Sequence, residues 1–115
     1  MADHNPTRRL VPIDLDKRRH LLFDFNTLAL LESLTGRNML GENAWDNLTA
    51  ADIRAFLYAG LLHEDPNLKL EQVGSFIHVG SVKQVAEALK KAQEVVEDEA
   101  EGKPVTGPQM AAGAA

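Results

Sequence analysis

Apolar and polar residues alternate along two short runs near the start of the chain, residues 11–15 and 21–25. Period-two alternation is typical of strands that bury one face. The polar stretch between the runs predicts a β-hairpin that turns near Asp16-Lys17, and Pro12 confines the first strand to a sheet edge. The apolar positions of the two runs are Val11, Ile13 and Leu15, then Leu21, Phe23 and Phe25.

The pattern then changes to helical spacing, with apolar residues three and four positions apart. We expect a first helix over residues 27–35, with Asn26 as its N-cap. Gly36 follows the last periodic position, as a C-terminal cap does. The apolar face of this helix comprises Leu28, Leu31 and Leu34.

A second helix is marked at both of its ends. Thr49-Ala50-Ala51-Asp52 has the capping-box pattern, with Asp in place of the usual Glu. Pro66 disfavours helix in the residue before it and so closes the segment. Residues 70–77 carry the spacing of a third, short helix. A fourth helix is expected from a cap at Ser81 to about Glu99.

Residues 37–48 form a connector between the first two helices, because Gly and Asn interrupt the periodicity there. The connector has no regular pattern of its own. Its large apolar residues are expected to pack on the core: Leu40, Trp45 and Leu48.

The chain has 115 residues, which suits one domain. The predicted fold class is mainly α, with an N-terminal β-hairpin followed by about four helices in one compact domain. This domain is expected to span residues 10–100. A flexible N-terminal arm (residues 1–9) precedes it and a disordered C-terminal tail (residues 101–115) follows it.

Composition narrows the chemistry. The chain has no cysteine, which excludes disulfides, thiolate metal sites and a cysteine nucleophile. Its formal net charge of -5 argues against a nucleic-acid partner. No apolar run approaches the roughly 20 residues that cross a bilayer, and the first residues lack a signal-peptide pattern. We therefore expect no cofactor, no nucleic acid and no membrane among its ligands.

The charge is unevenly spread, which suits docking to charged protein partners or simply solubility. Basic residues crowd the N-terminal part, in Arg8-Arg9 and in residues 17–19. Acidic residues crowd the end of the expected fourth helix: Glu94, Glu97, Asp98, Glu99 and Glu101.

Three polar groups have a catalytic or binding interpretation, and each has a simpler structural one. His63-Glu64-Asp65, with His78, lacks the HExxH spacing, and zinc needs three or four converging ligands. We interpret it as a solvated loop and expect no metal. The basic turn at residues 17–20 is interpreted as a solvated charged turn rather than a phosphate contact. Three carboxylates show no pairing that suits acid–base catalysis: Asp24, Glu32 and Asp52.

One ordered series of motifs is distinctive. It runs Phe23-Asp24-Phe25-Asn26-Thr27-Leu28, then Leu31-Glu32-Ser33-Leu34-Thr35-Gly36, then Leu48-Thr49-Ala50-Ala51-Asp52-Ile53-Arg54-Ala55-Phe56-Leu57-Tyr58-Ala59-Gly60-Leu61, then Asp65-Pro66-Asn67-Leu68-Lys69-Leu70-Glu71-Gln72-Val73-Gly74. In order and spacing it resembles the tail assembly chaperones of long-tailed phages and gene transfer agents. The resemblance covers about residues 10–95 and rests on packing motifs rather than on chemical ones. Ser33 and Lys69 stand where that pattern often has Glu and Thr.

The resemblance implies a non-enzymatic protein that binds the tape measure protein, keeps its long hydrophobic helices from aggregating and helps to recruit the tail tube protein. It also implies action in the host cell cytoplasm and absence from the mature virion. The alternative from another class is a structural tail or neck component retained in the particle. A third interpretation is a small DNA-binding regulator that uses the helix pair within residues 50–77.

Contacts with a partner are expected from the second and fourth helices, because an amphipathic helix docks a partner through residues three and four positions apart. For the fourth helix, packing on its own core and binding a partner are both open. Self-association is open too, because the same helical stripes would serve a self-interface. The candidate partner-binding residues are Tyr58, Leu62, Leu89 and Val96.

Overall fold

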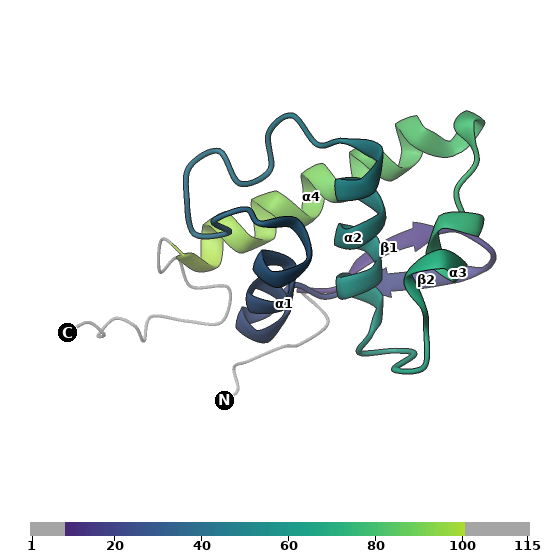
Figure 1. Cartoon of the computed structure of the whole chain (residues 1–115), viewed down its shortest axis with the longest axis horizontal. Coiled ribbons are helices and arrows are strands. Elements are labelled where there is room, and N and C mark those ends of the chain that lie inside the picture. The colour runs from purple at the N-terminus through teal and green to yellow at the C-terminus, as the bar shows by residue number, and fades with distance from the viewer. Residues whose placement is uncertain (1–8, 101–115) are drawn as a thin grey trace.

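The hairpin predicted at the N-terminus is present (Figure 1). In the computed structural model, which describes residues 9–100, strands β1 (Val11–Asp14) and β2 (Arg18–Leu21) pair antiparallel. The turn occupies residues 15–17, as predicted. Because the described sheet has two strands, both are edges, and the proline at position 12 is tolerated there.

The second strand lies earlier than the alternation predicted. It takes in three polar residues of the expected turn and ends at Leu21, so the prediction of a strand over residues 21–25 was wrong. Arg19 explains the difference, because its side chain is buried. Its guanidinium donates to both carboxylate oxygens of Asp16, at 2.7 and 2.8 Å, and lies 4.8 Å from the centre of the Phe76 ring. A paired and stacked arginine thus fills an inward-facing strand position.

The first helix, α1 (Phe25–Thr35), begins two residues before the predicted start at position 27. Its N-cap is Asp24 and not Asn26, because the Asp24 carboxylate accepts from the Thr27 N–H and hydroxyl, both at 2.9 Å. Phe25 therefore lies in the first helical turn and faces outward, instead of occupying a buried strand position.

Both helix ends that flank the connector are capped as predicted. Gly36 ends α1 in the left-handed region, with φ at 75°. The Thr49 hydroxyl accepts from the Asp52 N–H and the Asp52 carboxylate accepts from the Thr49 N–H, which caps α2 (Ala50–Leu61). Leu34 was wrongly assigned to the buried face of α1: it lies about 120° around the helix from Leu28 and is exposed.

Three further elements complete the described chain: α3 (Leu70–Ser75), the 3-10 turn η2 (Val79–Ser81) and α4 (Val82–Ala100). Helix α3 ends before the predicted residue 77. Ser81 does not cap α4 as predicted, because its hydroxyl bonds backward to the main chain of His78 and closes η2.

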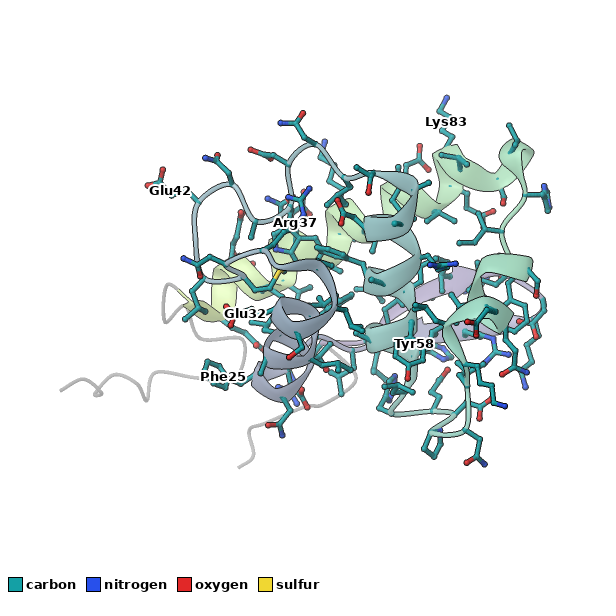
Figure 2. The ribbon with its side chains drawn as sticks, in the orientation of Figure 1. Phe25, Glu32, Arg37, Glu42, Tyr58 and Lys83 are labelled. Carbon is teal, nitrogen blue, oxygen red and sulfur yellow. The ribbon has the colours of Figure 1, made fainter. Side chains whose placement is uncertain are left out.

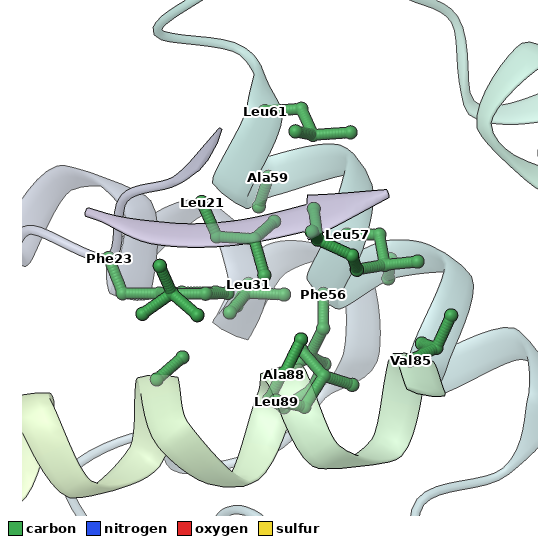
Figure 3. Packing of buried hydrophobic residues seen from close by; sticks show 14 of the residues in the cluster. Leu21, Phe23, Leu31, Phe56, Leu57, Ala59, Leu61, Val85, Ala88 and Leu89 are labelled. Carbon is green, nitrogen blue, oxygen red and sulfur yellow. The ribbon is translucent and has the colours of Figure 1, made fainter. Parts of the chain in front are cut away.

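Helix α2 lies at the centre of the core. It packs against α1, α3 and β2, while α4 packs against β1. Figure 3 shows side chains of these elements meeting in one cluster. Gly60 lets α2 approach the end of β2 closely, since a Cβ at this position would lie 3.0 Å from Leu21 Cδ2 and Phe23 Cζ. The largest fully buried side chains are Phe56, Leu21, Leu31, Leu57, Leu61, Val73 and Val85.

The described residues therefore have the predicted fold class: mainly α, with a hairpin followed by four α-helices. The predicted tail at residues 101–115 lies outside the described residues, as does the predicted arm at residues 1–9 apart from Arg9. Within the described range, no helix is both long and apolar enough to cross a bilayer.

Candidate functional site

An apolar groove opens where the start of α1, the connector and the last turns of α4 meet; we call it the α1–α4 groove. Its volume is about 650 Å³. Two of its side chains, Phe25 and Leu40, are 70% and 69% exposed. Large apolar side chains gathered at the surface mark an interaction site. The apolar lining comprises Phe23, Phe25, Leu28, Met39, Leu40, Trp45 and Val96.

Carboxylates line the same groove. Figure 2 shows Glu42 on the connector and Phe25 on α1 at one end of the molecule, away from Lys83. Burial raises the pKa of Asp24, but the hydrogen bonds from Thr27 and Asn26 and the charge of Arg9 together outweigh burial and leave that pKa lowered. The acidic residues of the lining are Asp24, Glu42, Glu97 and Glu99.

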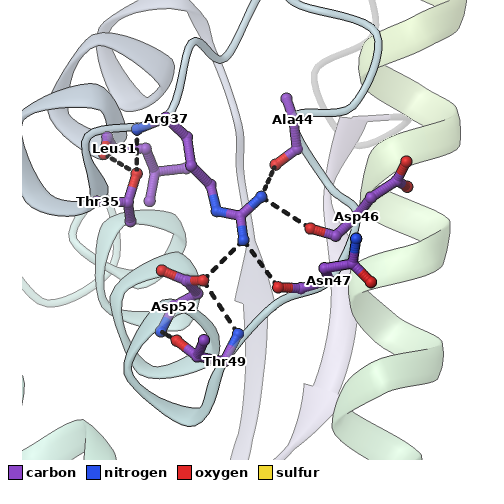
Figure 4. A network of polar contacts seen from close by, with 8 residues as sticks. All are labelled: Leu31, Thr35, Arg37, Ala44, Asp46, Asn47, Thr49 and Asp52. Atoms are coloured by element: carbon purple, nitrogen blue, oxygen red, sulfur yellow. Dashed lines mark hydrogen bonds and ion pairs between the residues drawn. The ribbon is translucent and has the colours of Figure 1, made fainter.

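One side chain, Arg37, holds the connector wall of the groove (Figure 4). Its guanidinium donates to the carbonyls of Ala44 at 3.3 Å, Asp46 at 2.8 Å and Asn47 at 2.9 Å. It also donates to the Asp52 carboxylate at 2.8 Å. These bonds tie the far end of the connector and the start of α2 to the end of α1. A segment without helix or strand thereby acquires a defined shape.

Two neighbouring connector residues that line the groove differ in exposure. Met39 is 3% exposed and packs in the core, and its N–H donates to the Glu32 carboxylate at 3.0 Å. Leu40 faces the groove, so the prediction that Leu40 packs on the core was wrong, because Met39 takes that place. Trp45 does pack on the core, edge-to-face between Phe23 and Phe56 with ring centroids 5.2 and 4.9 Å away.

The four candidate partner-binding residues do not share one surface. Val96 lines the α1–α4 groove. Leu89 is 3% exposed and belongs to the core, so it offers no surface to a partner in this conformation. Tyr58 and Leu62 are half-buried against the core and do not line the groove.

A second apolar groove lies at the other end of α4, with a volume of about 390 Å³. It is formed by the start of α2, the end of α3, η2 and the start of α4. Val79 is 92% exposed there, and the Nε of Arg54, which also lines this groove, is buried without a hydrogen-bond partner among the described residues.

The histidine and acid cluster after α2 fastens the loop to the hairpin. The Glu64 carboxylate accepts from the His20 N–H at 3.0 Å and from its Nδ1 at 2.8 Å, and His63 Nε2 donates to the His20 carbonyl at 2.7 Å. Burial raises the pKa of Glu64, but the contacts with His20 and the charge of His63 together outweigh burial and leave that pKa lowered. Among residues 9–100, no group of three His, Asp or Glu side chains is placed to hold a metal ion.

The basic turn and the three carboxylates also have local partners. Arg18 donates to Asp14 at 2.6 Å, and Arg19 donates to Asp16 at 2.7 Å. Of the carboxylates, Asp24 caps α1, Glu32 accepts from the connector, and Asp52 binds Arg37. Each of these three carboxylates therefore accepts a hydrogen bond that supports the fold, and the three bonds are at separate places.

Sequence reasoning missed Phe25 and Leu40 as surface residues. A signal for Phe25 was available, because Asp is a favoured N-cap residue. An N-cap at Asp24 places Phe25 in the first helical turn and Thr27 at the third helical position. Leu40 had no such signal, since its orientation depends on Met39 occupying the core.

Comparison with known proteins gives no further guide to the site. The chain matches no protein-family model, no curated protein and no solved structure.

Proposed function

We propose that this protein is a tail assembly chaperone that binds the tape measure protein, keeps it soluble and helps to recruit the tail tube protein. In this proposal it is not an enzyme, acts in the host cell cytoplasm and is absent from the mature virion. Two things support the proposal: the ordered motifs between residues 23 and 74, and the α1–α4 groove.

The exposed apolar lining of the groove carries the proposal. A protein that shields hydrophobic helices needs an apolar surface that it presents to solvent without losing its own fold. Phe25 and Leu40 provide such a surface. The Asp24 cap and the Arg37 bonds hold the segments that carry these two side chains, together with the buried Leu28 and Met39 beside them.

Co-expression with the tape measure protein from the same genome neighbourhood tests this function. The tape measure protein is expected to aggregate when expressed alone and to stay in a soluble complex when co-expressed. A tape measure protein that aggregates in both cases, with nothing co-purifying, would contradict the proposal.

The alternative, a structural tail or neck component, is separated by mass spectrometry of purified particles. The chaperone proposal expects this chain to be absent from finished particles. Its presence in stoichiometric amount would favour the structural component instead.

A further inference from the structure

We infer that the α1–α4 groove takes a basic amphipathic α-helix, with its apolar face in the groove and its cationic flanks on the surrounding carboxylates. This inference rests on the proposed function and deepens it, because it names the chemistry of the partner segment.

Charge complementarity selects a basic partner. Four of the groove's lining residues are acidic, and none of the described residues that line it is Lys, Arg or His. Arg9 lies 3.6 Å from Glu99 and offsets one charge. Glu97 is bonded to the neutral Gln93 amide, and Glu42 forms no ion pair with another described residue. The mouth of the groove is therefore electronegative and attracts cations.

The shape of the lining selects a helix. The apolar side chains come from α1, the connector and α4 and surround a hollow, the arrangement in which an amphipathic helix docks through residues three and four positions apart. Neither β1 nor β2 contributes to the lining, so a partner strand has no strand to pair with there. Phe25 and Leu40 project into solvent, whereas a small molecule is usually enclosed on most sides.

The first test uses two synthetic peptides of about four helical turns. Both carry Leu at spacings of three and four; the flanks are Lys in one peptide and Glu in the other. Trp45 is the sole tryptophan and lines the groove, so its fluorescence reports binding. The Lys peptide is expected to bind and to weaken as salt rises, and the Glu peptide to bind at least tenfold more weakly, roughly the effect of two or more surface charge pairs. Equal binding of both peptides, or binding of neither, would overturn the inference.

Variants locate the contact. Leu40→Ser with Phe25→Ser removes exposed apolar surface and should abolish binding while leaving the fold intact. Glu42→Lys with Glu97→Lys should reverse the preference between the two peptides. Glu94→Lys is the matched control, because Glu94 is exposed on the same helix but does not line the groove. An equal loss of binding in Glu94→Lys would show that general acidity, and not the groove, is responsible.

The same variants separate this inference from the proposed function. If the wild-type chain retains the tape measure protein and the groove variants retain it equally well, the groove assignment fails and the chaperone function stands. If the wild-type chain retains no tape measure protein, the function fails whatever the peptides do. A second copy as the occupant would appear in sedimentation as a dimer that the Leu40→Ser/Phe25→Ser variant dissociates, and this too would overturn the inference.

Discussion

The centre of the molecule and the connector are held in shape by different forces. Helix α2 is fixed by burial, with Phe56, Leu57 and Leu61 fully enclosed among neighbouring elements. The connector has no helix or strand. Hydrogen bonds from Arg37 hold its far end, while Met39 and Trp45 pack on the core. Apolar burial around α2 is spread over many side chains, whereas several polar contacts of the connector meet on one guanidinium.

This difference bears directly on the α1–α4 groove. Two of its walls belong to helices, and the third, with Leu40 and Glu42, belongs to the connector. Stability of the fold therefore resides mainly in one region and the shape of the binding surface in another. Substitutions in the two regions should separate these properties.

The largest loss of stability is expected from a substitution in the core around α2. Phe56→Ala removes a fully buried ring and should lower the free energy of unfolding by about 3–5 kcal/mol. Chemical denaturation measures this, and the denaturant dependence should be unchanged if unfolding stays cooperative. A loss below about 1 kcal/mol would mean that the core refills the space.

A smaller and local effect is expected at the connector. Arg37→Met leaves the carbonyls of Ala44, Asp46 and Asn47 without their donor and should cost about 2 kcal/mol. Hydrogen exchange should show faster exchange of the Gly41 and Asp46 amides with little change in α2. Arg37→Lys should restore less than half of the loss, because an ammonium lacks the planar fork.

Arg18→Met is the matched control for Arg37→Met. Arg18 is an exposed arginine paired with Asp14, and its loss should change stability by no more than about 0.5 kcal/mol. Equal effects of the two substitutions would show that Arg37 has no special role in shaping the connector.

The smallest change in stability is expected from a substitution at Asp52 that acts through the dependence of stability on acid pH. The Thr49 N–H and then Arg37 lower the pKa of Asp52, so the folded state binds its proton less readily than the unfolded chain does. The contribution of Asp52 to stability is full above the unfolded pKa of about 3.9 and is lost as the pH falls through the lower folded pKa. Asp52→Asn should therefore flatten the decline of stability with falling pH below about 4.

Asp46→Asn controls for the charge change, because its carboxylate makes no hydrogen bond within residues 9–100 and its carbonyl, which binds Arg37, is retained. The free energy of unfolding measured between neutral and acid pH decides the matter. Identical pH profiles for Asp52→Asn and the wild-type chain would contradict the role assigned to the ionised Asp52 carboxylate in stabilising the fold.

The sequence predicted those elements whose signals are local. Helix α2 was predicted from its capping box and spacing, the end of α1 from Gly36, and the hairpin turn from the polar residues at 16–17. In each case, a few adjacent residues carry the physical cause. The fold class follows from these elements because each one buries an apolar face.

The misplaced elements depend on contacts between distant residues. Strand β2 was misplaced because Arg19 is buried through Asp16 and Phe76, and its own charge predicts exposure. The connector was unpredictable because Arg37 binds carbonyl groups, which every residue possesses. The groove joins α1, the connector and α4. Of its lining, the sequence anticipated Val96 as a contact and the acidic end of α4 as a docking surface.

The ion pair between Arg9 and Glu99 brings the two ends of the described chain together. A short linker from residue 9 to residue 99 could therefore join them in a circular permutant, with new termini opened at the exposed bond between Pro66 and Asn67. Such a permutant would carry fusion tags on the loop after α2, away from Glu99 and the groove mouth. Surface immobilisation through these new termini would keep the support away from the groove, whose mouth would carry only the short linker at residue 99.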